Sequence, residues 1–282
     1  MNISIIITFS VPFFSLPYMI DANNEVLKQQ VREYWNAHPC GTQFTELEWG
    51  SKKFFDEVER FRYETQPFMR SLLEFYNFRG KQLLEIGCGL GTDLLHFARA
   101  GAKVTGVDLT PASIELVKKR FSLEGLPVDA QVADAENLPF ADASFDVVYS
   151  FGVLHHTPNT HKTIDEVYRV LKPGGRAIIM LYHKNSVHVY LGAPLFRLSH
   201  RLRPGARTLV EDWVRVYDGA ENPLGKAYSR SEVRRMFSKF SSLRMTACDP
   251  IRRKYPAAVN WLNQKLLSKR WGFWLVIKAE KQ

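Results

Sequence analysis

The residues with the clearest chemical meaning form a glycine-rich stretch between an apolar run and a helix-like segment. It reads Glu85-Ile86-Gly87-Cys88-Gly89-Leu90-Gly91-Thr92. Glycines at alternate positions remove Cβ atoms, so the backbone can turn tightly and a ligand can approach it closely. Backbone N–H groups at the start of the following helix favour a carboxylate or a phosphate. A dinucleotide fingerprint requires glycine where this chain has Thr92, so a nicotinamide dinucleotide is a poor fit.

Two further carboxylates follow the next two apolar runs. Asp108 stands 17 residues after Gly91, where the second run ends, and Asp134 follows the third run. A carboxylate at the end of the second strand can accept hydrogen bonds from the ribose hydroxyls of an adenosine group. Acids after three successive strands suit a ligand that is cationic or rich in hydroxyl and amino groups, rather than a pyrophosphate. S-adenosylmethionine has this chemistry.

The chain resembles the class I S-adenosylmethionine-dependent methyltransferases with a methyltransferase type 11 domain, and within them the ubiquinone/menaquinone C-methyltransferase branch. Four motifs carry the resemblance, in the family's order, over residues 82–181: LLEIGCGLGTDLLHFA, VTGVDLTPASIELVKKR, VADAENLPFADASFDVVYSFGVLHHTPN and EVYRVLKPGGRAIIM. The resemblance implies S-adenosylmethionine as the cofactor of an enzyme that methylates a small molecule.

The resemblance also implies a role for individual residues. Those at the methionine end of the cofactor would be Glu85, Gly87 and Gly89, with Cys88 and Gly91 of the same loop. The remaining predicted cofactor residues are Asp108 at the ribose, Leu109 against the adenine, Asp134 and Ala135 at the adenine amine, and Phe151 near the transferred methyl. Two positions have structural alternatives, since Gly91 also suits helix–strand packing and Cys88 suits a tight loop that needs a small residue.

Methyl transfer from a sulfonium is an in-line displacement, so the protein chiefly supplies alignment, which can account for ~7–11 kcal/mol of barrier. A general base is needed only if the acceptor must lose a proton. Candidate catalytic residues are His155 and His156, after the fourth predicted strand, and Tyr182, at the end of the fifth. Predicted residues of the acceptor pocket are His183 and, by resemblance to lid residues, Tyr34 and Trp35. The alternative is that the two histidines and Trp35 belong to the scaffold.

The apolar pattern predicts the elements that position these residues. Short apolar runs predict strands at 81–87, 103–109, 128–134, 145–154, 176–183, 241–249 and 272–281. Helical spacing predicts helices at 24–38, within 51–77 with a break near Pro67, and at 92–100, 112–121, 160–171, 230–240 and 256–269. Ser229 or Ser231 would cap the helix at 230–240. Alternating strands and helices predict an α/β fold with a doubly wound, seven-stranded, mostly parallel Rossmann-like sheet, whose last strand is antiparallel.

The pattern also suggests a division of the chain. We expect an apolar N-terminal extension (1–22), an N-terminal helical lid (23–80), an S-adenosylmethionine-binding core (81–185), an inserted substrate cap (186–229) and a C-terminal completion of the sheet (230–282). Residues 1–20 carry no charge, lack the basic start of a signal peptide and are interrupted by Pro12 and Pro17, so they do not predict a membrane span. One hypothesis is that translation begins at Met19, which would leave residues 1–18 out of the native protein.

Charge is distributed unevenly along the chain. Residues 1–180 contain 18 Lys and Arg against 22 Asp and Glu, whereas residues 181–282 contain 20 against 7. A basic C-terminal third can favour anionic lipid, nucleic acid or an acidic substrate, and an ordinary solvated surface explains it equally well. Apolar residues mixed with arginines at 187–203 suggest a lipophilic acceptor or a peripheral membrane contact, and the alternative is a cap helix packed on the core with its arginines in water. Three scattered cysteines predict a reducing, cytoplasmic setting, with neither a disulfide framework nor a metal site.

These observations favour an enzyme that methylates a small lipophilic or aromatic acceptor, with the accepting atom (C, O or N) left open. One alternative is an RNA or other nucleic-acid methyltransferase, which the basic C-terminal third suggests. Against it, the segment SFGVLHH stands where a base-flipping motif is expected. Another alternative is a non-catalytic S-adenosylmethionine-binding protein, because a cofactor loop does not prove turnover. The oligomeric state is left open.

Overall fold

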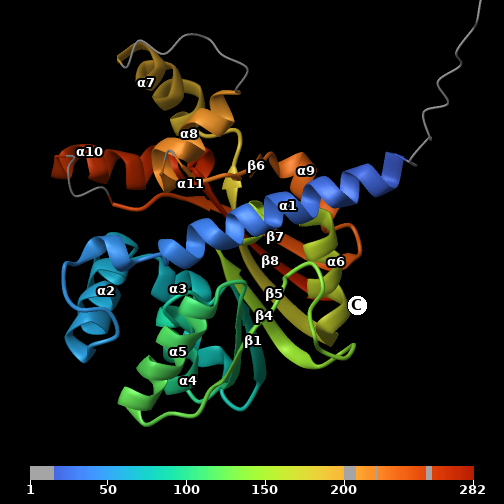
Figure 1. Ribbon diagram of the computed structural model, residues 1–282. Helices are drawn as coiled ribbons and strands as arrows, with labels where there is room; N and C mark the ends of the chain where they lie inside the picture. The colour runs from blue at the N-terminus through green and yellow to red at the C-terminus, as the bar shows by residue number, and fades with distance from the viewer. Residues whose placement is uncertain (1–15, 200–207, 220, 252–255) are drawn as a thin grey trace, which may run out of the picture.

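A mixed β-sheet runs through the centre of the molecule (Figure 1). The structure, a computed structural model, describes residues 16–199, 208–219, 221–251 and 256–282. The strand order is β3-β2-β1-β4-β5-β8-β7, and a short β6 pairs with β5. The strands are β1 (Gln82–Ile86), β2 (Lys103–Asp108), β3 (Asp129–Val132), β4 (Phe145–Phe151), β5 (Leu171–His183), β6 (Ala227–Tyr228), β7 (Phe240–Cys248) and β8 (Trp274–Lys281).

Among the strands in the described part of the chain, β8 runs opposite to the others and pairs antiparallel with β5 and β7. The predicted α/β fold with a mostly parallel sheet is therefore confirmed, with β6 added to the seven expected strands. The strand order reverses direction beside β1, between β1 and β4, and ligands of open α/β sheets bind outside the carboxyl ends of the strands at such a point.

Helices cover both faces of the sheet because the buried residues of each strand alternate between two cores. In β1, Leu83 belongs to one core and Leu84 to the other, and Val147 and Val148 divide in the same way in β4. The first core is completed by α4 (Thr92–Arg99) and α5 (Pro111–Glu124), and the second by α6 (Thr160–Val170) and α9 (Arg230–Met236).

The remaining elements surround these layers. They are α1 (Leu16–Ala37), η1 (Thr42–Phe44), α2 (Lys52–Thr65), α3 (Met69–Leu73), η2 (Phe75–Phe78), η3 (Leu154–His156), η4 (His188–Gly192), α7 (Ala193–Ser199), α8 (Leu209–Asp218), α10 (Ala257–Leu262), η5 (Asn263–Leu267) and α11 (Ser268–Trp271). Some of them, such as α3, η2 and α8, add buried side chains to the first core. The long α1 crosses the carboxyl edge of the sheet (Figure 1), and Lys28 contacts Asp134 beyond β3 while Trp35 contacts His156 beyond β4.

The structure corrects two of the predicted elements and decides between the two candidate caps of a third. The helix expected at 160–171 ends at Val170, and β5 begins at once at Leu171, so Pro173 to Gly175 lie within the strand. The pairing of β5 with β4 shifts register between Phe145 and Val147, which accommodates this glycine–proline stretch. The helix expected at 256–269 is divided by a π-helical turn, η5. Ser229, rather than Ser231, caps α9 through a capping box with Glu232.

Residues 1–15 of the predicted N-terminal extension (1–22) lie outside the described residues, as do Arg201 and Arg203 of the predicted cap, whereas residues 16–22 belong to α1. Among the helices that the structure describes, none has both the length and the apolar character needed to cross a bilayer.

Candidate functional site

The glycine-rich loop between β1 and α4 turns through three glycines with positive φ. These angles are +73° at Gly87, +51° at Gly89 and +66° at Gly91. A Cβ at Gly87 would lie 2.3 Å from Val153 Cγ2, whereas a Cβ at Gly89 would meet nothing within 4 Å. Gly87 is therefore needed for conformation and packing, while Gly89 presents open backbone that a ligand can approach. At Gly91 a Cβ would lie 3.2 Å from Val117 Cγ2, which is consistent with the packing role.

Glu85 is a buried acid with an unused hydrogen-bonding atom. The residue is 4% exposed, and its Oε2 has no hydrogen-bond partner among the described residues. Burial, aided by the charge of Asp93, raises the pKa of Glu85 well above its usual range. Because an unsatisfied buried oxygen is costly, a cationic or hydroxyl donor beside Glu85 would be stabilised there. The ammonium group of S-adenosylmethionine is such a donor.

Asp108 is held at the end of β2 with its carboxylate beside the loop. Gly89 N donates to Asp108 Oδ2 at 3.0 Å, and the N–H and hydroxyl of Thr110 donate to Oδ1 at 2.9 and 2.8 Å. Each carboxylate oxygen can accept more than one hydrogen bond, so this acid can also accept ribose hydroxyls. The residues at this edge therefore fit S-adenosylmethionine. Cys88 belongs to the loop through its backbone, because its buried Sγ lies close to Gly106 of β2.

Asp134, the acid predicted at the adenine amine, is in contact with α1. Its Oδ2 accepts a hydrogen bond of 2.7 Å from Lys28 Nζ, and its Oδ1 accepts one of 2.8 Å from the N–H of Glu136. Lys28 Nζ also lies 3.3 Å from Glu136 Oε2. The predicted adenine neighbours Leu109 and Ala135 are partly buried at the same edge. Glu136, which the sequence analysis missed, also accepts the N–H of Asn159 at 2.7 Å.

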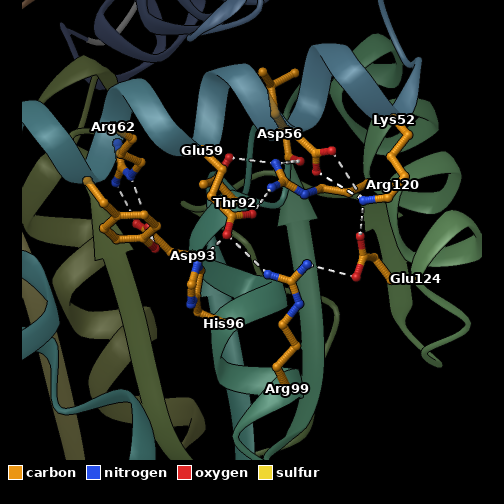
Figure 2. A network of polar contacts seen from close by, with 12 residues as sticks. Lys52, Asp56, Glu59, Arg62, Thr92, Asp93, His96, Arg99, Arg120 and Glu124 are labelled. Atoms are coloured by element: carbon orange, nitrogen blue, oxygen red, sulfur yellow. Dashed lines mark hydrogen bonds and ion pairs between the residues drawn. The ribbon is translucent and has the colours of Figure 1, made fainter.

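A buried network that the sequence analysis missed joins α2 to the core beside the loop (Figure 2). Arg62 binds Asp93 through two hydrogen bonds, and the hydroxyls of Tyr63 and Tyr149 donate to the same carboxylate at 2.8 and 2.6 Å. Burial alone would raise the pKa of Asp93, but Arg62 and the two hydroxyls hold it below its usual range. The guanidinium of Arg62 also lies 5.2 Å from the ring centre of Phe151, the residue predicted near the transferred methyl.

A second network in Figure 2 joins three helices around the same loop. The buried Arg120 of α5 donates to Thr92 Oγ1 at 2.8 Å and to Glu59 of α2. Burial opposes ionisation of Glu59, but the neighbouring His96, Arg120 and Arg99 lower its pKa to about 2. Because Thr92 begins α4, this network fixes the end of the glycine-rich loop against α2 and α5.

The three candidate catalytic residues lie together, with His155 and His156 after β4 and Tyr182 near the end of β5. The rings of His155 and Tyr182 are 3.8 Å apart, and those of His155 and His156 are 4.3 Å apart. Neither ring nitrogen of the fully buried His155 has a hydrogen-bond partner among the described residues. Burial lowers the pKa of His155 well below its usual range, so the ring is neutral at neutral pH. This arrangement leaves a neutral imidazole able to bind a polar group of a ligand.

Asp218, at the end of α8, completes this group. Its Oδ1 accepts a hydrogen bond of 2.7 Å from the Tyr182 hydroxyl, and its Oδ2 lies 3.6 Å from His156 Nε2. His156 Nδ1 contacts the carbonyl oxygen of Leu224 and must donate to it, which leaves Nε2 facing Asp218. Burial raises the pKa of Asp218 despite His156 and Tyr182. We call His155, His156, Tyr182 and Asp218 the acceptor-side cluster.

Two of the three predicted acceptor-pocket residues border this cluster. The Trp35 ring lies 5.3 Å from that of His156, and the Tyr34 hydroxyl donates to the backbone oxygen of Asp218 at 2.8 Å. His183 is buried, and its Nδ1 lies 3.0 Å from the carbonyl oxygen of Gly272, so its direct contact is with the chain before β8. Its assignment to the pocket stays a prediction, as do the roles of the other site residues.

Comparison with known proteins identifies the domain. Residues 84–179 match the family model described as a methyltransferase domain. The sterol 4-C-methyltransferase strm-1 of Caenorhabditis elegans is 41% identical over 98 residues, which cover 34% of this chain and 29% of that protein. The phthiotriol/phenolphthiotriol dimycocerosates methyltransferase of Mycobacterium leprae is 46% identical over 101 residues, which cover 35% of this chain and 37% of that protein. The matched region thus spans about a third of the length of these curated relatives.

Solved structures extend the likeness to most of the chain. The geranyl diphosphate C-methyltransferase of Streptomyces coelicolor A3(2) gives a TM-score of 0.59 at 16% identity, covering 91% of this chain and 98% of that one. The magnesium protoporphyrin IX methyltransferase of Synechocystis PCC 6803, solved with S-adenosylhomocysteine, gives a TM-score of 0.57 at 17% identity, covering 90% and 100%. At such identities the likeness concerns the fold. Residues 84–179 therefore match a methyltransferase domain, and the chain shares its fold with methyltransferases that were solved with S-adenosylhomocysteine.

Proposed function

We propose that the chain transfers the methyl group of S-adenosylmethionine to a small lipophilic acceptor. The proposal rests on the order in which two groups of residues lie along one edge of the sheet. The cofactor acids end β1 and β2, and the acceptor-side cluster follows β4 and β5, which continue the same parallel sheet. A cofactor on the first pair of strands would therefore have its acceptor on the second pair.

Each part of this edge has a task in the proposal. Glu85 would bind the methionine ammonium, Asp108 the ribose hydroxyls, and Gly89 would let the ligand approach the backbone. Bound S-adenosylmethionine supplies a methyl group already activated by its positive sulfur. The buried network around Asp93 would keep the loop and Phe151 in fixed positions, which is how alignment lowers the barrier of a displacement.

The acceptor-side cluster can hold a proton at defined atoms. His156 Nε2 and Asp218 Oδ2 face each other at 3.6 Å, and the Tyr182 hydroxyl holds the other oxygen of Asp218. If the acceptor loses a proton on methylation, His156 Nε2 or Asp218 Oδ2 could take it, and His155 could orient the accepting group. A general base of this kind contributes typically ~10²–10⁴-fold.

Aromatic side chains around the cluster support a lipophilic acceptor. The ring centre of Tyr182 lies 4.4 Å from that of Phe273 and 5.6 Å from that of Tyr217. On the side of the cluster that faces α1, the ring of Trp35 packs against that of His156. The names of the two curated relatives, a sterol methyltransferase and a methyltransferase of phthiotriol lipids, point in the same direction. The accepting atom is left open in this proposal.

A binding and turnover experiment tests the proposal. The purified chain is titrated with S-adenosylmethionine by calorimetry and then incubated with sterols, long-chain alcohols, phenols and quinones, with S-adenosylhomocysteine release as the readout. The variant Asp108→Ala should weaken cofactor binding at least tenfold, whereas Asp129→Ala, an exposed acid on the adjacent β3, should leave it unchanged. Equal affinities of the two variants for S-adenosylmethionine would contradict the proposed cofactor site. Cofactor binding without turnover on any lipophilic acceptor would contradict the proposed reaction.

A further inference from the structure

Two segments at one end of the molecule expose an unusual share of its large apolar side chains. Of the fifteen exposed large apolar residues in the described part of the chain, eight lie in η4–α7 and α10–η5–α11. They are Tyr190, Leu191, Leu195, Leu198, Trp261, Leu262, Leu266 and Trp271. The exposure is large, reaching 77% at Leu198, 64% at Leu266 and 62% at Trp261. We call these eight residues the apolar end surface.

The two segments are connected through Asp249. Asp249 Oδ1 lies 3.2 Å from His188 Nε2 at the start of η4, and its backbone oxygen accepts a hydrogen bond of 2.7 Å from Gln264 of η5. The N–H of Phe273, next to α11, also donates to this carboxylate at 2.7 Å. Both segments lie at the upper left of Figure 1, on the side of α1 that faces away from α4 and α5. One buried aspartate therefore holds both amphipathic segments at the same end.

The charges of these segments indicate which partner would cover them. Residues 188–199 and 257–271 together contain four Lys and Arg and neither Asp nor Glu. Lys265, Lys269 and Arg270 are exposed beside the apolar residues, and the guanidinium of Arg270 lies 5.2 Å from the ring centre of Trp271. A second copy of the chain would bring like charges together, whereas anionic lipid headgroups would neutralise them. Trp and Leu with Lys and Arg on one face are typical of helices that lie in a membrane interface.

We propose that the apolar end surface binds a membrane surface that contains anionic lipid. The apolar side chains enter the boundary between headgroups and acyl chains, while Lys265, Lys269 and Arg270 contact the phosphates. The same inserted region continues into α8, whose last residue is Asp218 of the acceptor-side cluster. A lipophilic acceptor would then reach the cluster from the side on which the chain meets the lipid.

Vesicle co-sedimentation of the full chain tests this surface. The vesicles are phosphatidylcholine alone or phosphatidylcholine with phosphatidylglycerol, at low and at high salt. We expect the unchanged chain to bind the anionic vesicles at low salt. Affinity for these vesicles should fall at least tenfold in the apolar variant Trp261→Ser/Leu266→Ser and in the charge variant Lys265→Glu/Lys269→Glu/Arg270→Glu. The matched control, Lys103→Glu/Lys118→Glu/Lys162→Glu, makes the same change of net charge at exposed positions elsewhere and should lose less than threefold.

Two other results would overturn the proposal. Equal losses in the two charge variants would show that binding follows net charge rather than this surface. Self-association without vesicles, abolished by Trp261→Ser/Leu266→Ser, would make a second copy the partner. Tryptophan fluorescence of the unmodified chain gives a second readout. Bromine-labelled lipid should quench the fluorescence of Trp261 and Trp271, and Trp261→Phe/Trp271→Phe should lose most of that quenching. Asp108→Ala should bind vesicles normally, which separates this proposal from the proposed methyl transfer.

Discussion

Replacing Asp93 with asparagine removes the charge at the centre of the buried network that joins α2 to the cofactor loop. Asp93 is 3% exposed and accepts four hydrogen bonds, two from Arg62 and one each from Tyr63 and Tyr149. An asparagine keeps the shape but turns one acceptor into a donor that faces other donors. Breaking a buried ion pair typically costs ~3–5 kcal/mol. Because the Arg62 side chain keeps 22% exposure, we expect the lower end, about 3 kcal/mol.

This loss is large enough to measure by thermal unfolding. With about 2.1 cal/mol/K of unfolding entropy per residue, a chain of 282 residues has an unfolding entropy of about 0.6 kcal/mol/K. Asp93→Asn should therefore lower the Tm by about 5 °C, followed by circular dichroism. The matched control is Asp56→Asn in α2, the helix that carries Arg62, because Asp56 pairs with Lys52 at the exposed surface (Figure 2). Exposed pairs contribute little, so its Tm should match that of the unchanged chain.

The reasoning also predicts a change at Glu85, whose pKa the charge of Asp93 helps to raise. In Asp93→Asn the carboxyl of Glu85 should ionise at lower pH, so the rise of S-adenosylmethionine affinity with pH should move to lower pH. A Tm of Asp93→Asn equal to that of Asp56→Asn would refute the assignment of a stabilising buried pair. An unchanged pH profile would refute the coupling between Asp93 and Glu85.

Three further predictions concern the loop and the acceptor-side cluster. The raised pKa of Glu85 means that its ionisation opposes folding. Its contribution to the stability of the folded chain therefore falls as the pH rises above the pKa that Glu85 has in the unfolded chain. Cofactor binding at the ionised form should release a proton when Glu85 is protonated in the free protein. Calorimetric heats of binding should then differ between phosphate and imidazole buffers of the same pH, and the difference should disappear in Glu85→Gln. Gly87→Ala should lower the Tm more than Gly89→Ala, because only the new Cβ at Gly87 would clash with Val153. Both variants should weaken cofactor binding at least tenfold. Equal Tm values for the two variants would contradict the packing argument. Asp218→Asn should reduce turnover by ~10²-fold or more while S-adenosylmethionine affinity stays within twofold, and normal turnover would exclude Asp218 from the reaction.

The sequence predicts the parts of this site that depend on local pattern. Buried runs followed by glycines identify β1, its loop and α4, because a parallel strand with both faces covered is apolar along its whole length. The acids Glu85 and Asp108 are recognisable because they interrupt or end such runs. The same locality explains the error at β5, where Pro173 and the glycines after it suggested a break. Leu171 before this stretch and Arg176 after it both pair with β4, so the strand continues across it.

Contacts between distant segments leave no comparable pattern. Arg62 and Asp93 are 31 residues apart, and Lys28 and Asp134 are 106 apart, so only the tertiary fold brings them together. Asp218 ends an aromatic stretch, DWVRVYD, that reads in sequence only as an amphipathic segment of an insertion. Its position beside His156 depends on where the insertion folds back over the sheet. An acid at the end of a stretch rich in aromatic residues is the sequence signal that could have drawn attention to it.

The single helix α1 contacts both ends of the proposed site. Lys28 reaches Asp134 at the predicted adenine end, and Tyr34 reaches the backbone of Asp218 at the acceptor end. The two residues are six positions apart along the helix, which is a rise of about 9 Å. Gly219 fits tightly under this contact, since a Cβ there would lie 2.5 Å from the Tyr34 hydroxyl oxygen. Because α1 is continuous between the two contacts, moving it away from Asp134 would also break its hydrogen bond with the chain that carries Asp218. Access to the cofactor end and the placement of the acceptor-side acid are thus mechanically linked through one helix.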